Sequence, residues 1–442
     1  MDSCPLYNAA RLLVAALALM PVGACSRRHS PSRADATTRI VATAGTAALA
    51  RSEPEHDAGP RPLHRCLPDT PVWTDAPVDA LLDRAAAQLD HGDNEAALAC
   101  AEEAARQAPA SVEAHQDRAL ALLGLGRLDD ARDAVTLLLA MAPQDPEALE
   151  LAANFYINHL PPSAEHSSIG LEYARRGGHL PAAGHDQSLR AQLALLEGQA
   201  LIDLGRAQEA LRPLTLALRL APDDQAAHYE RGVAWFELCR FEAAQRELEA
   251  VVAADPTHAY ALFHLGLIAE RSGKESLAEQ RFAEASKADP SGFPPVPSVS
   301  LQEFSERTRR TVAHLPADVQ KDLATIKLEI ADLPNLEDLT AEVPPLSPTI
   351  LGLYRGLPLG REDTNLPAAP ARGRHRSAGR AHTAGQPAQP IPARAVVVYR
   401  RNILRSARSL AEVDQVIERT LLHEVGHLRG EDDGSLRDRG LE

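Results

Sequence analysis

The chain has 442 residues, of which 45% are hydrophobic but only 4% are aromatic, and its formal net charge is -15 at pH 7. This composition, rich in Ala and Leu, favours a soluble helical body, and the acidic balance argues against nucleic acid as a partner. The sequence also lacks a phosphate-binding glycine loop and any Ser/His/Asp arrangement that stands out from chance.

The first 25 residues have the features of a bacterial export signal. The apolar stretch Leu12–Val22 is too short to span a bilayer and has the length of a signal-peptide core. It leads into Val22-Gly23-Ala24-Cys25, which resembles a lipobox with Cys25 as the lipidated residue. We therefore expect export to the cell envelope and a membrane anchor on Cys25. Because Ser26 rather than Asp follows, the outer membrane is the expected destination in a cell that has one. A buried or frayed terminal helix is the alternative, since Asp2 leaves the leader weakly charged.

Residues 26–75 are rich in Arg, Ser, Thr, Ala and Pro, which predicts a tether of little structure. After removal of the signal and acylation of Cys25, three cysteines remain: Cys66, Cys100 and Cys239. Cys66 and Cys100 can pair in an oxidising compartment, but their spacing does not fix that pairing. Cys239 occupies a position that otherwise holds a small residue, and we expect its thiol to be buried.

Residues 76–292 contain a repeat of 34 residues, marked by Pro109 and Pro143 and again by Pro222, Pro256 and Pro290. Small residues recur at fixed offsets in this frame: Ala85, Ala119, Gly198, Gly232 and Gly266; Gly92, Gly126, Gly205, Cys239 and Gly273; and Ala97, Ala131, Ala210, Ala244 and Ala278. Small residues at these offsets let two antiparallel helices approach closely and turn tightly. This is the tetratricopeptide pattern.

One repeat, between Pro146 and His185, carries an insertion that includes Leu160-Pro161-Pro162-Ser163. With five recognisable units and this degenerate one, we predict six helical hairpins stacked into a solenoid. Its concave face is expected to dock a protein or peptide, although the array can instead act only as a spacer between a membrane and the C-terminal domain. The aromatic residues of the array are expected to pack between helices: Tyr229, Trp235, Phe236, Phe241 and Phe263.

Residues 300–442 predict a small α+β unit. A helix from Ser305 to His314 ends before Pro316, and Ile326, Leu328 and Ile330 alternate with charged residues as in a half-buried strand. The run Ala395–Tyr399 is typical of a buried strand. The expected fold class is therefore mostly α: a tetratricopeptide α-solenoid followed by a small α+β domain.

An insertion at residues 367–392 interrupts this unit. It contains Pro, Ala, Gly and four arginines but no acidic residue, so it cannot bury enough apolar surface to offset its ordering entropy. We expect a mobile basic loop, and an insertion without a role is favoured over a substrate-capturing lid. His375 and His382 lie in this loop and are not expected to be metal ligands.

The last predicted helix spans about residues 410–429. Ser409 and Glu412 form an S-x-x-E capping box, and apolar residues follow at helical spacing. The helix carries an HExxHxxGxxD pattern that runs from His423 to Asp433. His423 lies close to the apolar stripe of this helix, so we expect its side chain inside a cleft rather than on a solvated face.

This pattern predicts a zinc site with a built-in base. Residues four apart share a helix face, so His423 and His427 can direct two imidazole nitrogens at one ion while Glu424 points beside it as a general base for water. Gly430 is expected to end the helix in a left-handed conformation, and Asp433 follows as an oxygen ligand. Three protein ligands leave a fourth position open, as in catalytic rather than structural zinc.

Alternatives to this interpretation remain open. Glu431 and Asp432 compete with Asp433 for the role of third ligand, and Asp433 is preferred on spacing alone. The two histidines can also belong to an ordinary helix without a metal. Because no Met follows Met141, the Met-turn of the metzincins is absent.

Four segments follow one another in a characteristic order: Phe304-Ser305-Glu306-Arg307, Leu351-Gly352-Leu353-Tyr354-Arg355-Gly356-Leu357-Pro358-Leu359, Tyr399-Arg400-Arg401-Asn402-Ile403-Leu404 and the histidine motif. In this order they resemble a family of short bacterial zincin-like metallopeptidases. The resemblance implies a minimal zincin fold, peptidase activity, zinc binding by His423, His427 and Asp433, and a general-base role for Glu424. Tyr354 is expected to be a packed aromatic rather than an oxyanion-stabilising group.

The sequence thus predicts an exported, lipid-anchored zinc-dependent peptidase whose repeats dock a protein partner or substrate. Its expected parts are a signal peptide at 1–25, a tether at 26–75, repeats at 76–292 and a zincin-like domain at 300–442. The alternative function is an envelope scaffold lipoprotein with an inactive zincin unit. A fourth protein ligand, or no metal at all, would favour that alternative.

Overall fold

The computed structural model describes residues 66, 77–359 and 394–441. The predicted signal peptide with Cys25, the tether apart from Cys66, and the basic insertion at 367–392 lie outside the described residues. Of the described residues, those in 162–171 and 194–441 form one compact unit, and those in 66–161 and 172–193 form another. In these same ranges, no helix combines the length and the apolar character that crossing a membrane requires.

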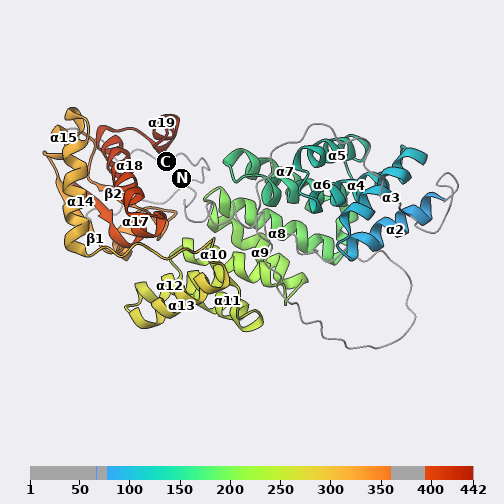
Figure 1. The fold of residues 1–442 in the computed structure, drawn as a ribbon, viewed down its shortest axis with the longest axis horizontal. Coiled ribbons are helices and arrows are strands. Elements are labelled where there is room, and N and C mark those ends of the chain that lie inside the picture. Colours follow the sequence, from blue (N-terminus) through green and yellow to red (C-terminus); the bar gives the residue numbers. More distant parts are fainter. Residues whose placement is uncertain (1–65, 67–76, 360–393, 442) are drawn as a thin grey trace, which may run out of the picture. The chain divides into compact units, whose positions relative to one another are not determined.

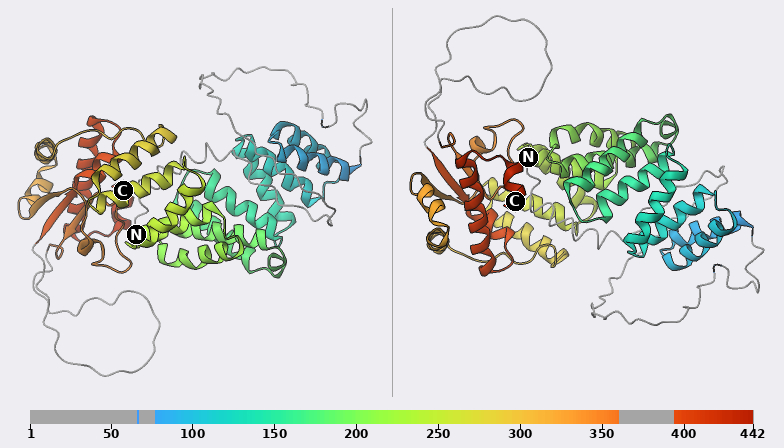
Figure 2. Two further views of the ribbon diagram at one scale, coloured as in Figure 1. Left: turned by 90° about the horizontal axis from the view of Figure 1, so that it is seen from below. Right: turned by 90° about the horizontal axis from the view of Figure 1, so that it is seen from above.

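Helical hairpins follow one another along the chain from Val78 to Ala288, as the 34-residue period predicts (Figures 1 and 2). The described residues contain six of them. Their helices are α2 (Val78–Asp90) and α3 (Asn94–Gln107), α4 (Val112–Gly124) and α5 (Leu128–Met141), α6 (Pro146–Asn154) and α7 (Ala164–His179), α8 (Gln187–Asp203) and α9 (Ala207–Leu220), α10 (Gln225–Glu237) and α11 (Phe241–Ala254), and α12 (Ala259–Arg271) and α13 (Glu275–Ala288). The predicted solenoid of tetratricopeptide type is confirmed.

The turn inside most hairpins holds a glycine in the left-handed conformation, for example Gly126 at φ 68° and Gly273 at φ 71°. Cys239 takes this place between α10 and α11 at φ 56°. The prediction that its thiol is buried was wrong, because the residue lies in the turn rather than between helices and is only half-buried. Its Sγ donates to the Leu346 carbonyl oxygen at 3.8 Å.

The predicted insertion shapes the third hairpin. After α6 the chain forms a π-helix, η2 (Phe155–His159), and a loop, and a 3-10 helix, η3 (Pro181–His185), separates α7 from α8. The aromatic residues of the later hairpins pack as expected: Phe236 is buried, and Tyr229, Trp235, Phe241 and Phe263 pack against the same cluster.

Cys66 and Cys100 form a disulfide, which settles the pairing that their spacing leaves open. Their Cα atoms lie 4.8 Å apart, and both residues are buried in the core of the first hairpin together with Leu81 and Ala85. The bond therefore attaches residue 66 directly to α3.

The α+β part contains a three-stranded sheet within the described residues, in the order β1-β3-β2. β3 (Ala395–Tyr399) is central and buried along its whole length, as its apolar run predicts. It pairs in parallel with β1 (Lys327–Ala331) and antiparallel with β2 (Gly352–Arg355). β2, an edge strand of this sheet, lies in the segment whose residues carry part of the family resemblance.

The helices of the α+β part within the described residues are α14 (Leu301–His314), α15 (Ala317–Leu323), α16 (Leu336–Leu339), α17 (Arg400–Ser406), α18 (Leu410–Arg429) and α19 (Asp433–Asp438). α14 begins four residues before the prediction because the Ser300 hydroxyl caps it, accepting from the Glu303 amide at 3.2 Å. α18 spans the predicted residues and begins at the expected capping box. It packs against β2, β3 and α14 and buries Val413, Ile417 and Leu421 (Figure 1).

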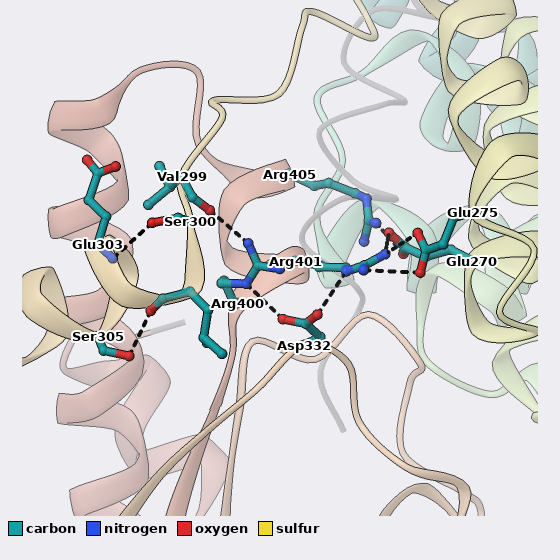
Figure 3. A network of polar contacts seen from close by, with 11 residues as sticks. Glu270, Glu275, Val299, Ser300, Glu303, Ser305, Asp332, Arg400, Arg401 and Arg405 are labelled. Carbon is teal, nitrogen blue, oxygen red and sulfur yellow. Dashed lines mark hydrogen bonds and ion pairs between the residues drawn. The ribbon is translucent and has the colours of Figure 1, made fainter.

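Two arginines of α17 attach this domain to the last repeat hairpin (Figure 3). Arg405 donates to Glu270, and each of these side chains is 6% exposed. Arg401 Nη1 lies 2.8 Å from Glu270 Oε1 and 2.8 Å from Glu275 Oε2. The contact joins residues that are more than a hundred positions apart in the sequence.

We predict that Glu270→Ala lowers the free energy of unfolding of this unit by about 3 to 5 kcal/mol, because it leaves the Arg405 guanidinium buried without its carboxylate. Glu275→Ala is the matched control. The Glu275 side chain is 54% exposed, so its ion pair with Arg401 should contribute less than about 1 kcal/mol. Guanidinium unfolding followed by circular dichroism measures both, and equal losses in the two variants would contradict the prediction.

Candidate metal centre

α18 and the start of α19 bring the three predicted metal ligands together. His423 Nε2 and His427 Nε2 lie 3.0 Å apart. Asp433 Oδ1 lies 3.2 Å from His427 Nε2 and 3.9 Å from His423 Nε2. Among the His, Cys, Asp and Glu residues within 66, 77–359 and 394–441, these three have ligand atoms close enough together to hold a metal ion. The ligand atoms all lie within 4.8 Å of one another.

The turn after α18 determines which acidic residue reaches the histidines. Gly430 ends the helix with φ 89°, and the Glu431 amide donates back to the Gly426 carbonyl at 3.0 Å. The Glu431 carboxylate then pairs with Arg439 at 2.6 Å, and Asp432 caps α19 by accepting from the Ser435 amide at 2.9 Å. Asp433, the first residue of α19, is the one of the three whose carboxylate faces the imidazoles.

The hydrogen bonds of the two rings indicate which nitrogens are available to a metal. His423 Nδ1 lies 2.7 Å from the Leu441 carbonyl oxygen, and His427 Nδ1 lies 3.1 Å from the Glu431 carbonyl oxygen. A carbonyl oxygen can only accept, so each Nδ1 carries the hydrogen and, in a neutral ring, each Nε2 carries a lone pair. Two lone pairs and a carboxylate oxygen therefore face one another, an arrangement that requires a cation between them.

A zinc ion fits this donor set. A tetrahedral ion with bonds of about 2.1 Å places its ligand atoms about 3.4 Å apart, and the three separations found here bracket that value. A proton is the competing cation: the hydrogen bond with Asp433 raises the pKa of His427 to about 9 and lowers the pKa of Asp433 below its usual range. Metal binding at such a site is therefore coupled to proton release.

Glu424 lies beside the cluster and is buried, with 5% of its surface exposed. Burial raises its pKa to about 7, against the opposing effect of the two histidines. A backbone hydrogen bond from Tyr354 on β2 also opposes this rise and lowers the pKa. Gly352 allows α18 and its Glu424 side chain to lie this close to β2, because a Cβ on residue 352 would lie 2.9 Å from Glu424 Oε1 and 2.6 Å from Thr420 Cγ2.

Some supporting groups were not foreseen from the sequence. The carbonyls of Glu431 and Leu441 could not be predicted as hydrogen-bond partners of the histidines, because every residue has a carbonyl and only the fold determines which one lies beside a given ring. Gly352 does have a signal in the sequence, a glycine inside a strand, which often marks a close backbone approach. Tyr354 directs its hydroxyl to the Leu357 carbonyl at 2.6 Å, as a packed aromatic would, and His375 and His382 lie outside the described residues.

Family models match both parts of the chain. Residues 370–441, which include part of the undescribed insertion, match the model of a zincin-like metallopeptidase. Residues 82–146 and residues 201–267 match two tetratricopeptide repeat models. The chain thus carries tetratricopeptide repeats followed by a zincin-like domain. No curated protein matches the sequence.

Solved structures similar to the chain are tetratricopeptide repeat proteins. YrrB, described as a TPR protein with an unusual peptide-binding site, is 19% identical over 43% of this chain and 93% of its own, with a TM-score of 0.34. PilF of Pseudomonas aeruginosa is 15% identical over 52% of this chain and 96% of its own, with a TM-score of 0.42. The Cut9-Hcn1 complex is 15% identical over 48% of this chain and 40% of the matched chain, with a TM-score of 0.43.

Proposed function

We propose that the chain is a zinc-dependent peptidase. The observation that carries the proposal is the convergence of His423, His427 and Asp433 on one point, with a second carboxylate, that of the buried Glu424, beside them. A structural zinc site closes with four protein ligands, whereas three ligands and a separate base are the parts that hydrolysis needs.

The chemistry divides between the ion and the protein. When bound, zinc supplies Lewis acidity: it polarises the scissile carbonyl and lowers the pKa of water to about 7. Glu424 takes a proton from the attacking water at its carboxylate and passes it to the leaving amine. The Tyr354 amide and the close approach of Gly352 hold that carboxylate in place.

The repeats are proposed to dock the substrate or a protein partner on their concave face. A cavity of about 700 Å³ among α10, α12, α13 and α17, where the last hairpins meet the zincin-like domain, is a second candidate place for such docking. The aromatic residues that line it and remain partly exposed are Tyr260, Phe263 and Phe282. Such a cavity can take up large apolar side chains of a bound peptide.

The experiment that tests the proposed activity uses the purified full chain. We expect about one zinc per chain by elemental analysis, and cleavage of a proteome-derived peptide library that stops when a chelator removes the metal and returns when zinc is restored. A zinc-loaded chain that cleaves nothing in the library would favour the scaffold function instead.

We also propose that the chain is exported and anchored through Cys25. The disulfide between Cys66 and Cys100 supports export, because such bonds persist in oxidising compartments and are rare in the cytosol. Cys239 remains as a free thiol.

Thiol labelling tests whether the chain resides in an oxidising compartment. In cells lysed without reductant, we expect the mature chain to react with a maleimide at one cysteine, Cys239. A Cys100→Ser variant should react at two, because it releases Cys66. Three reactive thiols in the unreduced wild-type chain would contradict the prediction of an oxidising compartment.

A further inference from the structure

The two imidazole rings are oriented by a segment that follows the motif. The Glu431 carbonyl oxygen accepts from His427 Nδ1, and the Leu441 carbonyl oxygen accepts from His423 Nδ1 at 2.7 Å. The same segment supplies Asp433 Oδ1. Residues 431–441, here called the clasp, therefore contact both histidines as well as providing the third donor.

The clasp is held against α18 by one buried side chain. Leu436 of α19 is fully buried, and it packs where α18 has a glycine: a Cβ on Gly426 would clash with Leu436 Cδ2. This packing sets the position of α19 relative to the two histidines. Within the clasp itself, Arg439 pairs with Glu431 at 2.6 Å.

A second left-handed glycine then turns the chain back toward His423. Gly440 has φ 71°, and its amide donates to the Arg437 carbonyl at 2.8 Å. The Leu441 amide donates to the Leu436 carbonyl at 3.1 Å, which completes the turn. The direction of the Leu441 carbonyl is thus set by the backbone of α19 and not by the side chain of Leu441.

From these contacts we propose that the clasp is a positioning element of the metal centre: through the carbonyls of Glu431 and Leu441 it holds a hydrogen on Nδ1 of both histidines and so directs each Nε2 to the zinc site. The inference rests on the proposed function, since it concerns affinity for the same ion. It assigns roles to Leu436 and Gly440, neither of which belongs to the HExxHxxGxxD pattern.

The test removes the Leu441 carbonyl from the full chain by deleting residues 440–442. Loss of an outer-shell partner typically costs 10- to 100-fold in metal affinity, so we expect the dissociation constant for zinc, measured by competition with a chromophoric chelator, to rise by about that factor. Leu441→Ala is the control: it changes the side chain but keeps the carbonyl, and it should bind zinc as the wild type does.

A point variant covers the case in which the deletion disturbs folding. Gly440→Val should redirect the Leu441 carbonyl, because a β-branched residue strongly disfavours positive φ. Gly434→Val places the same side chain in α19 at a glycine without positive φ, and a Cβ there would meet only Asp432 Oδ1 at 3.6 Å. We expect weaker zinc binding in the first variant and nearly unchanged binding in the second.

A readout that does not depend on zinc separates this proposal from the peptidase itself. In the zinc-free chain, nitrogen NMR of labelled histidine should show a hydrogen on His423 Nδ1 in the wild type and a tautomer mixture in the deletion and in Gly440→Val. Unchanged tautomer and unchanged zinc affinity in both variants would overturn the positioning role. A wild-type chain that binds no zinc would instead overturn the proposed function, and the NMR result would still decide the role of the clasp.

Discussion

Glu424→Gln is expected to lower kcat for peptide hydrolysis by about 10²- to 10⁴-fold while leaving zinc bound, which is the usual contribution of a general base. The substitution preserves the size of the side chain, and its amide oxygen can still accept the hydrogen bond from the Tyr354 amide. It removes the carboxylate that takes the proton from water. Steady-state cleavage of a peptide found in the library, together with zinc content, measures the two consequences separately.

Glu418→Gln is the matched control for this experiment. Glu418 lies on the same helix, α18, but on its exposed face, so the identical substitution should change neither zinc content nor kcat. Equal activity of Glu424→Gln and the wild type would rule out the proposed mechanism. A parallel loss of zinc in Glu424→Gln would also count against it, since it would place Glu424 among the ligands.

Asp433→Ala is expected to weaken zinc binding by more than the roughly 10- to 100-fold that loss of an outer-shell partner costs, because it removes a direct donor. The two remaining imidazoles cannot by themselves hold the ion as tightly. Zinc content after dialysis and the dissociation constant from chelator competition measure the effect. The experiment also decides between the three consecutive acidic residues.

Glu431→Ala serves as the control for the third ligand. It keeps the backbone carbonyl that accepts from His427 and loses only the partly exposed ion pair with Arg439, so zinc binding should stay close to that of the wild type. Asp432→Ala removes the cap of α19 and should have an intermediate effect, since a cap contributes about 1 kcal/mol. A larger loss of zinc in either variant than in Asp433→Ala would mean that the wrong carboxylate has been assigned.

Several elements could be read from the sequence because their signals are local. The capping box and the apolar spacing placed α18 at Leu410–Arg429, and the apolar run placed β3 at Ala395–Tyr399. The 34-residue period predicted the hairpins, since each is a unit that recurs with its own turn. The short helices α15 and α16 and the edge strand β2 had no comparable pattern, and neighbouring elements stabilise them.

The order of residues by itself determined the kind of chemistry: two histidines one helical turn apart, a glutamate beside the first, and acidic residues after a helix-ending glycine. It favoured Asp433 over Glu431 and Asp432 on spacing alone; the reason lies in the fold, where Glu431 pairs with Arg439 and Asp432 caps α19. It could not show that Cys66 joins Cys100, that Arg405 finds Glu270, or that the Leu441 carbonyl orients His423. Those contacts join residues that are distant in the chain, or use backbone groups that every residue shares, so only the folded arrangement selects them.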